Sequence, residues 1–320
     1  MKVFVAGATG AIGKQLIPQL VAAGHEVTGM TRSPAKADAL RALGAKAAVA
    51  DGLDRTAVRE AVLRAEPEAV IHQMTSLTGT FNLKKFDEFF ALTNRLRTEG
   101  TDYLLEAAQA AGARRFLAQS HCNDFERTGA LVKSEDDPLD PDPPAALRRL
   151  LAAIRHLEAA TLGAAGIEGL ALRYANFYGP GTNLAPGGEM VELVRKRRLP
   201  IIGDGSGVWS LIHMVDAAAA TVAAVERGAP GVYNVADDEP APASVWLPEL
   251  ARVLGAKPPL RVPVWLGRLA AGEAGVLLFT CLRGASNAKA KRELGWELRY
   301  PSWRDGFRHD LAAQPNGKAA

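Results

Sequence analysis

The chain has 320 residues, of which 48% are hydrophobic and 23% charged, and its formal net charge is +3. Such a composition is typical of a soluble globular protein with a large core. The small net charge provides no argument for a nucleic-acid partner or an anionic membrane surface. The cysteines Cys122 and Cys281 fit neither a zinc spacing nor a disulfide framework, and the first apolar strand starts too early for a signal peptide. We therefore expect a cytoplasmic protein that binds neither nucleic acid nor membrane.

The first thirteen residues carry the strongest local signal. A buried strand over residues 2–6 leads directly into Gly7-Ala8-Thr9-Gly10-Ala11-Ile12-Gly13, and an amphipathic helix follows over residues 14–21. This context gives a glycine series its meaning as a dinucleotide-binding turn. Gly7 permits the tight turn, Gly10 lets the backbone approach a pyrophosphate, and Gly13 lets the helix pack closely on the strand.

Strand and helix patterns alternate through the first half of the chain. After the first helix, strands are expected at residues 26–30, 45–50, 69–72, 115–119 and 169–174, with helices at 37–43, 55–64, 94–111 and 145–162. Such alternation predicts an α/β fold: a Rossmann-type, doubly wound parallel sheet with helices on both faces. We predict a dinucleotide-binding domain over residues 1–175. Residues 176–320 are predicted to form a smaller substrate-binding lobe, interleaved with the last sheet elements.

Three features outside the Rossmann pattern allow two interpretations each. The basic run over residues 195–198 is either a solvated helix end or a clamp for an acidic substrate. The apolar stretch over residues 264–282 is interrupted by Arg268 and Glu273, which favours a core or interface helix over a membrane span. Finally, five large apolar residues are either core or the lining of a cleft for an apolar or ring-shaped substrate: Met190, Trp209, Trp246, Trp265 and Phe279.

The end of the second strand bears on the choice of cofactor. An acidic residue there binds the ribose 2′-hydroxyl of NAD, whereas an arginine accommodates the 2′-phosphate of NADP. This chain has Arg32, with Ser33 and Lys36 close behind, and no acid. The sequence therefore favours NADP, with NAD as the alternative.

Several further segments resemble one protein family when their order and spacing are taken together. They are residues 51–53 after the third strand, 70–74 at the fourth, 99–108 in the central helix, 172–181 after the sixth strand, and later segments at 203–205, 212–216, 233–236 and 288–296. Nearly the whole chain is thereby similar to the extended short-chain dehydrogenase/reductase superfamily, also called NAD-dependent epimerase/dehydratases. The resemblance implies a homodimer that binds a dinucleotide and a small-molecule substrate.

The glycine turn and this resemblance together predict the cofactor-binding residues. They are Gly7, Thr9, Gly10, Ala11, Ile12, Gly13, Arg32, Asp51, Gly52, Leu53, His72, Gln73, Met74, Ser120, Tyr174, Asn176 and Phe177. No cluster of His, Cys or acidic residues has the spacing of a metal site, so no metal is expected.

The usual catalytic pair of this family is missing. Its chemistry rests on a tyrosine and a lysine one helical turn apart, where the ammonium lowers the pKa of the phenol. None of the five tyrosines of this chain is followed four residues later by lysine, and the resemblance places the pair near Leu150 and Ile154. The family's Ser/Thr position falls on His121.

His121 is the leading candidate for the acid or base that replaces this pair. A histidine titrates near neutral pH and, at the carboxyl end of a strand, would lie beside the cofactor. Its alternative role is that of a hydrogen-bonded residue lining the pocket. Ser120, Asn123 and Tyr178 complete the predicted catalytic set.

These observations predict an NAD(P)-dependent oxidoreductase that acts on a carbonyl, alcohol or enone of a small to medium organic molecule. One alternative is an epimerase or dehydratase that works by transient oxidation. The others are a cofactor-binding sensor or structural protein, and a non-redox cyclase or dehydratase that has lost the Tyr–Lys chemistry.

Overall fold

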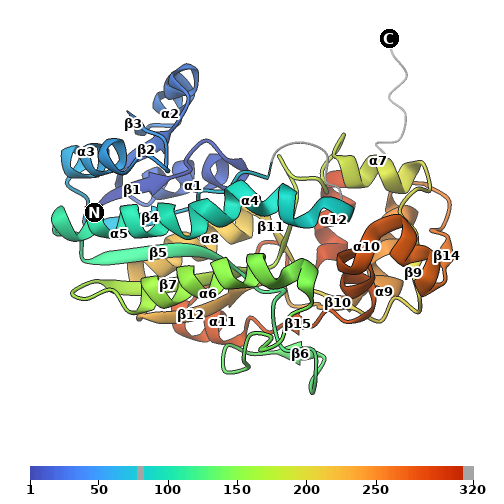
Figure 1. Ribbon diagram of the computed structural model, residues 1–320. Helices are drawn as coiled ribbons and strands as arrows, with labels where there is room; N and C mark the ends of the chain where they lie inside the picture. Colours follow the sequence, from blue (N-terminus) through green and yellow to red (C-terminus); the bar gives the residue numbers. More distant parts are fainter. Residues whose placement is uncertain (78–82, 313–320) are drawn as a thin grey trace, which may run out of the picture.

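A parallel seven-stranded sheet forms the centre of the molecule (Figure 1). The computed structural model describes residues 1–77 and 83–312. The strand order is β12-β7-β5-β4-β1-β2-β3. The strands are β1 (Lys2–Ala6), β2 (Glu26–Thr31), β3 (Lys46–Val49), β4 (Ala69–His72), β5 (Arg115–His121), β7 (Glu168–Tyr174) and β12 (Gly231–Val235). The order reverses between β1 and β4, which is where doubly wound sheets bind their ligands. The predicted fold class is confirmed.

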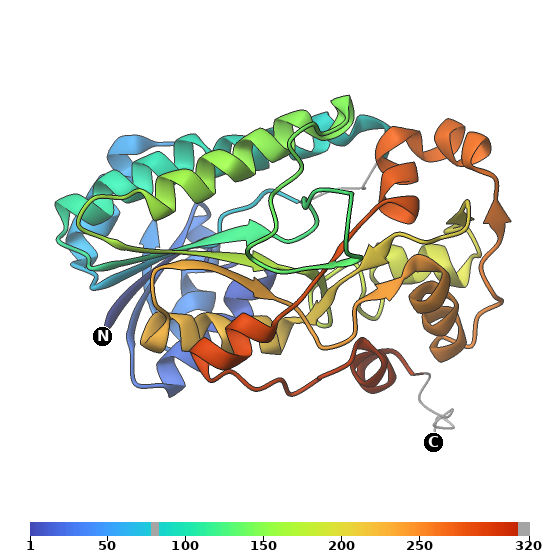
Figure 2. The same ribbon diagram turned by 90° about the horizontal axis from the view of Figure 1, so that it is seen from below.

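Helices cover both faces of this sheet, and Figure 2 shows the sheet between the two helical layers. Apolar residues of α1 (Ala11–Ala22), α8 (Met214–Arg227) and α11 (Ala288–Leu294) share one core cluster with the sheet. Those of α3 (Arg55–Ala65), α5 (Glu99–Ala110) and α6 (Arg148–Leu162) form the core on the opposite face. The short helix α2 (Ala37–Ala42) precedes β3 at the edge of the sheet. All sheet contacts between neighbouring strands are parallel, as βαβ crossovers require.

The structure differs from the predicted elements at two places near the site. The single helix predicted over residues 94–111 is two helices, α4 (Phe86–Arg97) and α5, joined at Thr98. Thr98 leaves helical geometry, and its hydroxyl donates to the carbonyl oxygens of Asn94 and Arg95 at the end of α4. Strand β5 extends to His121, two residues beyond its predicted end. Both differences change which side chains reach the edge of the sheet.

The C-terminal lobe packs around its own apolar core at the carboxyl end of the sheet (Figure 1). Its helices are α7 (Glu189–Arg195), α9 (Ala243–Val253), α10 (Val264–Thr280) and α12 (Trp303–Leu311). Its short strands pair as β8 (Asn176–Tyr178) with β11 (Leu211–His213), β9 (Ile201–Ile202) with β14 (Arg261–Val262), and β10 (Val208–Trp209) with β13 (Ala241–Pro242). A further pair joins β6 (Val132–Lys133) to β15 (Gly284–Ala285).

Helix α10 is the apolar stretch noted in the sequence. It is kinked at Gly272, which has a φ of 69°, and only part of it is buried. Within the described residues, no helix has the length and apolar character needed to cross a membrane.

Candidate functional site

The glycine turn between β1 and α1 is built for close backbone approach. Gly7 has a φ of +85°, and a Cβ on it would lie 2.5 Å from the carbonyl oxygen of Gln73 at the end of β4. A Cβ on Gly13 would lie 2.2 Å from the carbonyl oxygen of Ala8. Larger residues would therefore separate β1 from β4 or lift α1 off its strand.

The start of α1 offers backbone donors to an anion. Gly10 is the N-cap, no side chain caps the helix, and its first turn contains no acidic residue. The unpaired N–H groups of a first helical turn attract negative charge. At the neighbouring end of β2, the hydroxyl groups of Thr9 and Thr31 lie 3.3 Å apart. The turn thus fits the pyrophosphate predicted from its glycines.

Arg32 follows β2 on the same edge of the sheet. Its side chain is exposed and has no ion-pair partner within the described part of the chain, and the same holds for Lys36. Both cations therefore remain available to a phosphate group.

The loops after β3 and β4 are held together by apolar and backbone contacts. The Asp51 carboxylate accepts from the backbone N–H of Leu53 at 2.9 Å, and a Cβ on Gly52 would lie 2.3 Å from the sulfur of Met74. These residues line the sheet edge where the adenosine contact is predicted.

The ring of His72, at the end of β4, forms hydrogen bonds within the protein. Its Nδ1 accepts from the backbone N–H of Met74 at 3.1 Å, and its Nε2–H donates to the carbonyl oxygen of Leu96 at 3.1 Å. Burial lowers its pKa to about 4, so the ring is neutral and this tautomer is held. The side chain is 1% exposed. It positions the strand end, and the predicted cofactor contact is not available to its ring nitrogens.

Gln73 and Tyr174 form a buried polar contact beneath the edge. The Gln73 side-chain amide donates to the Tyr174 hydroxyl at 3.0 Å, which lies 2.7 Å from the hydroxyl of Thr221 on α8. Tyr174 is 1% exposed, and burial raises its pKa to about 12. The predicted cofactor role of Tyr174 is thereby corrected to a structural one, because its only polar group is used inside the protein.

His121 is the centre of a polar relay at the carboxyl end of β5. Its Nδ1 lies 3.0 Å from Oδ2 of Asp124, and its Nε2 lies 3.0 Å from the side-chain nitrogen of Asn123. Since a carboxylate only accepts, Nδ1 carries the proton and Nε2 is the acceptor. Asn123 also donates to Asn176 at 2.9 Å, and Asn176 donates to the carbonyl oxygen of Ser210 at 2.9 Å. The structure thus brings His121 and Asn123, at the end of β5, together with Asn176 of β8.

Ser120 points to the other side of β5. Successive side chains of a strand alternate between faces, so Ser120 and His121 diverge. The Ser120 hydroxyl donates to Oε1 of Glu158 on α6 at 2.6 Å, and Arg173 of β7 binds the same carboxylate with two hydrogen bonds of 2.7 Å. Burial would lower the pKa of Arg173, but the hydrogen bonds and charge of Glu158 raise it. The proton that Ser120 was predicted to offer to substrate or cofactor is therefore committed to Glu158.

Tyr178 lies in the core of the C-terminal lobe. It is fully buried, and its ring packs edge-on against those of His213 and Phe307. Burial, together with the charge of Asp237, raises the pKa of its hydroxyl well above the ordinary value of 10. The predicted role of Tyr178 as a proton donor is not supported by this position, because the phenol is buried between the rings of His213 and Phe307.

Helix α6 presents an apolar surface where the resemblance placed Tyr and Lys. Leu150 is 3% exposed and Ile154 is fully buried, and both pack in a cluster with Phe86 of α4 and Ala274 of α10. The helix contains neither tyrosine nor lysine along its length. Its one buried carboxylate, Glu158, already holds Arg173 and Ser120.

Arg97, the last residue of α4, is a buried cation that the sequence reasoning missed. It is 4% exposed, and its Nε and Nη1 have no hydrogen-bond partner in the part of the chain that the structure describes. Its neighbour Leu96 is bound to His72 at the end of β4, and the charge of Asp124 acts on Arg97. Burial lowers its pKa to about 10, so the guanidinium remains charged at neutral pH. In a helical sequence pattern an arginine is normally predicted to lie on the surface. The helix break at Thr98 is the one local feature that indicates a different environment for Arg97.

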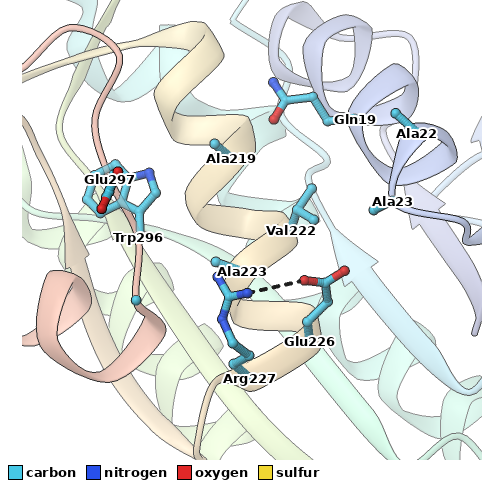
Figure 3. Close-up of a pocket in the computed structure, with 11 residues that line it drawn as sticks. Gln19, Ala22, Ala23, Ala219, Val222, Ala223, Glu226, Arg227, Trp296 and Glu297 are labelled. Carbon is cyan, nitrogen blue, oxygen red and sulfur yellow. Dashed lines mark ion pairs between the residues drawn. The ribbon is translucent and has the colours of Figure 1, made fainter.

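Two cavities lie outside this polar edge. The larger, of about 480 Å³, is a groove between α1, α8 and residues 295–297 (Figure 3), rimmed by the Glu226–Arg227 ion pair. None of the predicted site residues lines it. The smaller, of about 100 Å³, lies in the C-terminal lobe among Met190, Leu193, Trp209, Trp246, Leu278 and Phe279. Of the five large residues noted in the sequence, only Trp265 is exposed and away from this cavity.

Within the described ranges 1–77 and 83–312, no group of three or more His, Cys, Asp or Glu side chains is placed to hold a metal ion.

Comparison with known proteins agrees with this geometry. A family model described as "NAD dependent epimerase/dehydratase family" matches residues 3–236. A "3-diazoavenalumate denitrifying reductase" from a Streptomyces species is 47% identical over 314 residues, covering 96% of this chain and 99% of that protein. A 2-alkyl-3-oxoalkanoate reductase from Stenotrophomonas maltophilia is 28% identical, covering 95% of this chain and 91% of that protein.

Solved structures share the fold. The UDP-glucose 4-epimerase of Thermus thermophilus in complex with NAD superposes with a TM-score of 0.73 at 24% identity, covering 98% of this chain and 97% of that chain. Relatives matched over more than nine tenths of this chain include reductases and a UDP-glucose 4-epimerase. The chain is an NAD-dependent enzyme of this kind and belongs to the NAD dependent epimerase/dehydratase family.

Proposed function

We propose that the chain is an NAD(P)H-dependent reductase that replaces the diazo group of an aromatic carboxylate with hydrogen. The observation that carries this proposal is the apolar face of α6, where Leu150 and Ile154 stand and no tyrosine or lysine is present. Reduction of a carbonyl needs a proton delivered to oxygen, and such a pair normally supplies it. A reaction that consumes no proton can dispense with the pair.

Loss of dinitrogen is a reaction of that kind. In the net reaction the C–N bond of an aryl diazonium breaks with its electron pair leaving on N₂, and a C–H bond forms from the hydride that bound NAD(P)H supplies. Charge and atoms balance without a proton. The 47% identical relative is named for reduction with nitrogen loss from a diazo carboxylate, which supports this choice over a carbonyl substrate.

The residues present fit the dinucleotide. The Gly7–Gly13 turn and the first turn of α1 would hold the pyrophosphate, and Arg32 and Lys36 would hold a 2′-phosphate, so we propose NADP as the preferred cofactor. Arg97 would place its unpaired N–H groups toward an anionic oxygen of the cofactor or substrate, because a buried guanidinium is costly without one.

The relay around His121 would orient the substrate. His121 is partly exposed, and Asp124 holds its imidazole in one tautomer with Nε2 as the acceptor. Asn123 and Asn176 bind one another and restrict the loop after β5 against β8. These groups would bind polar atoms of the substrate and exclude water from the diazonium, which hydrolyses readily in water.

The test uses purified protein with a benzenediazonium carboxylate and NADPH carrying deuterium at the transferred position. We expect deuterium in the arene, and N₂ and oxidised cofactor in equal amounts, well above a reaction mixture without protein. In this reaction His121→Ala should lower kcat by less than about 10-fold, because no proton transfer depends on the imidazole. Turnover of ketones in place of the diazonium would overturn the proposal.

A second candidate, a carbonyl reductase, is favoured by the Asp124–His121 pair itself. An imidazole oriented by a carboxylate is a competent general acid. Under this function His121→Ala should lower the rate of ketone reduction by about 100-fold or more. The same variant thus separates the two functions.

We further propose a homodimer in the cytoplasm. Cys122 and Cys281 are both free thiols, which fits a reducing compartment. Light scattering of the purified chain should give the mass of two copies, and the mass of one copy would exclude the dimer.

A further inference from the structure

The C-terminal lobe holds a partly open cavity whose lining is mainly apolar and aromatic. Its floor consists of Trp209, Trp246 and Phe279, which are at most 6% exposed, and its walls include Met190, Leu193 and Leu278. Trp209 lies 5.0 Å from Trp246 and 6.2 Å from Phe279 by ring centroids. Flat rings and a methionine at this spacing suit a flat, apolar ligand.

The cavity does not suit a nucleoside diphosphate. No arginine, lysine or histidine is among the described residues that line it, and its one charged lining residue is Glu189. The basic run over residues 195–198 lies at the end of α7, fully on the surface, with Arg197 bound to the carbonyl oxygen of Pro258. A pyrophosphate needs cations at the contact, and none is present here.

One hydrogen bond joins the polar relay to the segment that follows β10, whose last residue, Trp209, lines the cavity. Asn176 donates to the carbonyl oxygen of Ser210, and Trp209 is the preceding residue. The indole Nε1 of Trp209 donates to the carbonyl oxygen of Leu278 at 2.9 Å, which fixes the ring against α10. Hydrogen bonds among His121, Asn123, Asn176 and Ser210 thus join the polar relay to the segment that carries Trp209.

We infer that this cavity binds the apolar, unsaturated part of the substrate that lies remote from the reacting carbon. The inference rests on the proposed function for the identity of that carbon, and it assigns the substrate class: an aryl carboxylate with an apolar extension, and not a nucleotide sugar. The cavity volume of about 100 Å³ is of the order that an aromatic ring occupies in protein interiors.

The experiment fills the cavity and compares two substrates. Met190→Trp adds a large ring at the wall of the cavity, and Lys196→Trp adds the same ring at an exposed position of α7 as the matched control. We expect Met190→Trp to raise KM at least about 10-fold for a diazonium carboxylate with a styryl extension and less than about 2-fold for the unextended benzenediazonium carboxylate, with Lys196→Trp unchanged. An equal change for both substrates, or for neither, would overturn the inference.

Binding of trans-cinnamate, which carries no diazo group, separates this inference from the proposed function. Calorimetric titration in the presence of NADP⁺ should show binding to the wild type and about 10-fold weaker binding to Met190→Trp, even if no diazonium is reduced. In that case the cavity assignment stands and the proposed reaction fails. Equal cinnamate affinity in the two proteins contradicts the assignment. Should Met190→Trp fail to fold, Leu193→Phe makes a smaller insertion into the same wall.

Discussion

The two ends of the candidate site recognise ligands by different means. At the β1–α1 turn the donors are backbone N–H groups, and the side chains matter mainly by their absence at Gly7, Gly10 and Gly13. At the β5–α6 edge the groups are side chains: Ser120 of β5 and Arg173 of β7 bind Glu158 of α6, and on the other face of β5 His121 binds Asp124. A site made of backbone groups tolerates few substitutions, but it can hold the same cofactor for different reactions. A site made of side chains can support a different reaction when those side chains are substituted. This contrast is compatible with a glycine turn beside a helix α6 that contains neither tyrosine nor lysine.

The largest effect is expected from Glu158→Gln at the side-chain end. Removing this carboxylate leaves Arg173 buried without its counter-ion, which should lower the free energy of unfolding by about 3–5 kcal/mol. The matched control is Glu99→Gln, because Arg95–Glu99 is a similar two-bond pair on the surface and should leave stability nearly unchanged. Denaturant titration measures both, and equal losses would show that burial of the pair is not the cause.

Gly7→Ala tests the backbone end. The added Cβ would meet the carbonyl oxygen of Gln73 and require an unfavourable φ of +85°, so dinucleotide affinity should fall by about 100-fold. Gly24→Ala is the control, since Gly24 has a φ of +81° with open space around its Cβ position. Fluorescence titration with NADPH should show near-normal affinity for that control. Equal loss in both variants would assign the effect to backbone strain alone.

Arg32→Ala tests whether the β1–α1 end of the site prefers NADPH or NADH. Loss of a cation beside the 2′-phosphate should raise KM for NADPH by about 10-fold and leave KM for NADH within about 2-fold. Arg41→Ala removes a nearby exposed arginine that already pairs with Asp38, and it should change neither value. A parallel rise for both cofactors would contradict a specific phosphate contact.

The smallest effect is expected from Asp237→Asn, which lies beyond the side-chain end near Tyr178. Burial raises the pKa of Asp237 well above 3.8, so the folded state binds its proton more tightly than the unfolded state does. The stability of the wild type should therefore fall as pH rises from about 4 toward the folded pKa. The variant cannot titrate there, so its Tm should gain on the wild type by roughly a few degrees between pH 4 and pH 8. A constant difference across this range would show that Asp237 is ionised in the folded protein.

Local patterns were sufficient for the scaffold and for the backbone end of the site. Strand β4 has the bounds that its apolar run predicts, and the glycine turn stands between β1 and α1 as expected, because period and turn chemistry are encoded within a few neighbouring residues. The break at Thr98 was not predicted, although the bonds of its hydroxyl to Asn94 and Arg95 are local. The extension of β5 to His121 was not predicted either, because it depends on pairing with β7, where His121 lies opposite Tyr174.

The side-chain end shows most clearly what the sequence left undecided. From the sequence, His121 was the leading candidate for contact with a substrate, and Ser120, Asn123 and Tyr178 completed the predicted set. Pleating of β5 turns Ser120 to Glu158 and leaves His121 at the edge, while packing of α12 against β11 buries Tyr178 among apolar rings. Arg97 becomes a buried cation only because α4 packs along α6.

The sequence by itself determined that a dinucleotide is bound, since that recognition uses backbone groups placed by a short run of glycines. Only the tertiary structure decided which side chains lie together at the candidate site and in the C-terminal cavity. Met190, Trp209, Trp246 and Phe279 are up to 89 positions apart and form one cavity because β10, α7, α9 and α10 converge. The chemistry of a side chain depends on the neighbours that folding brings to it. The function of the glycine turn, in contrast, is encoded within the first thirteen residues of the chain.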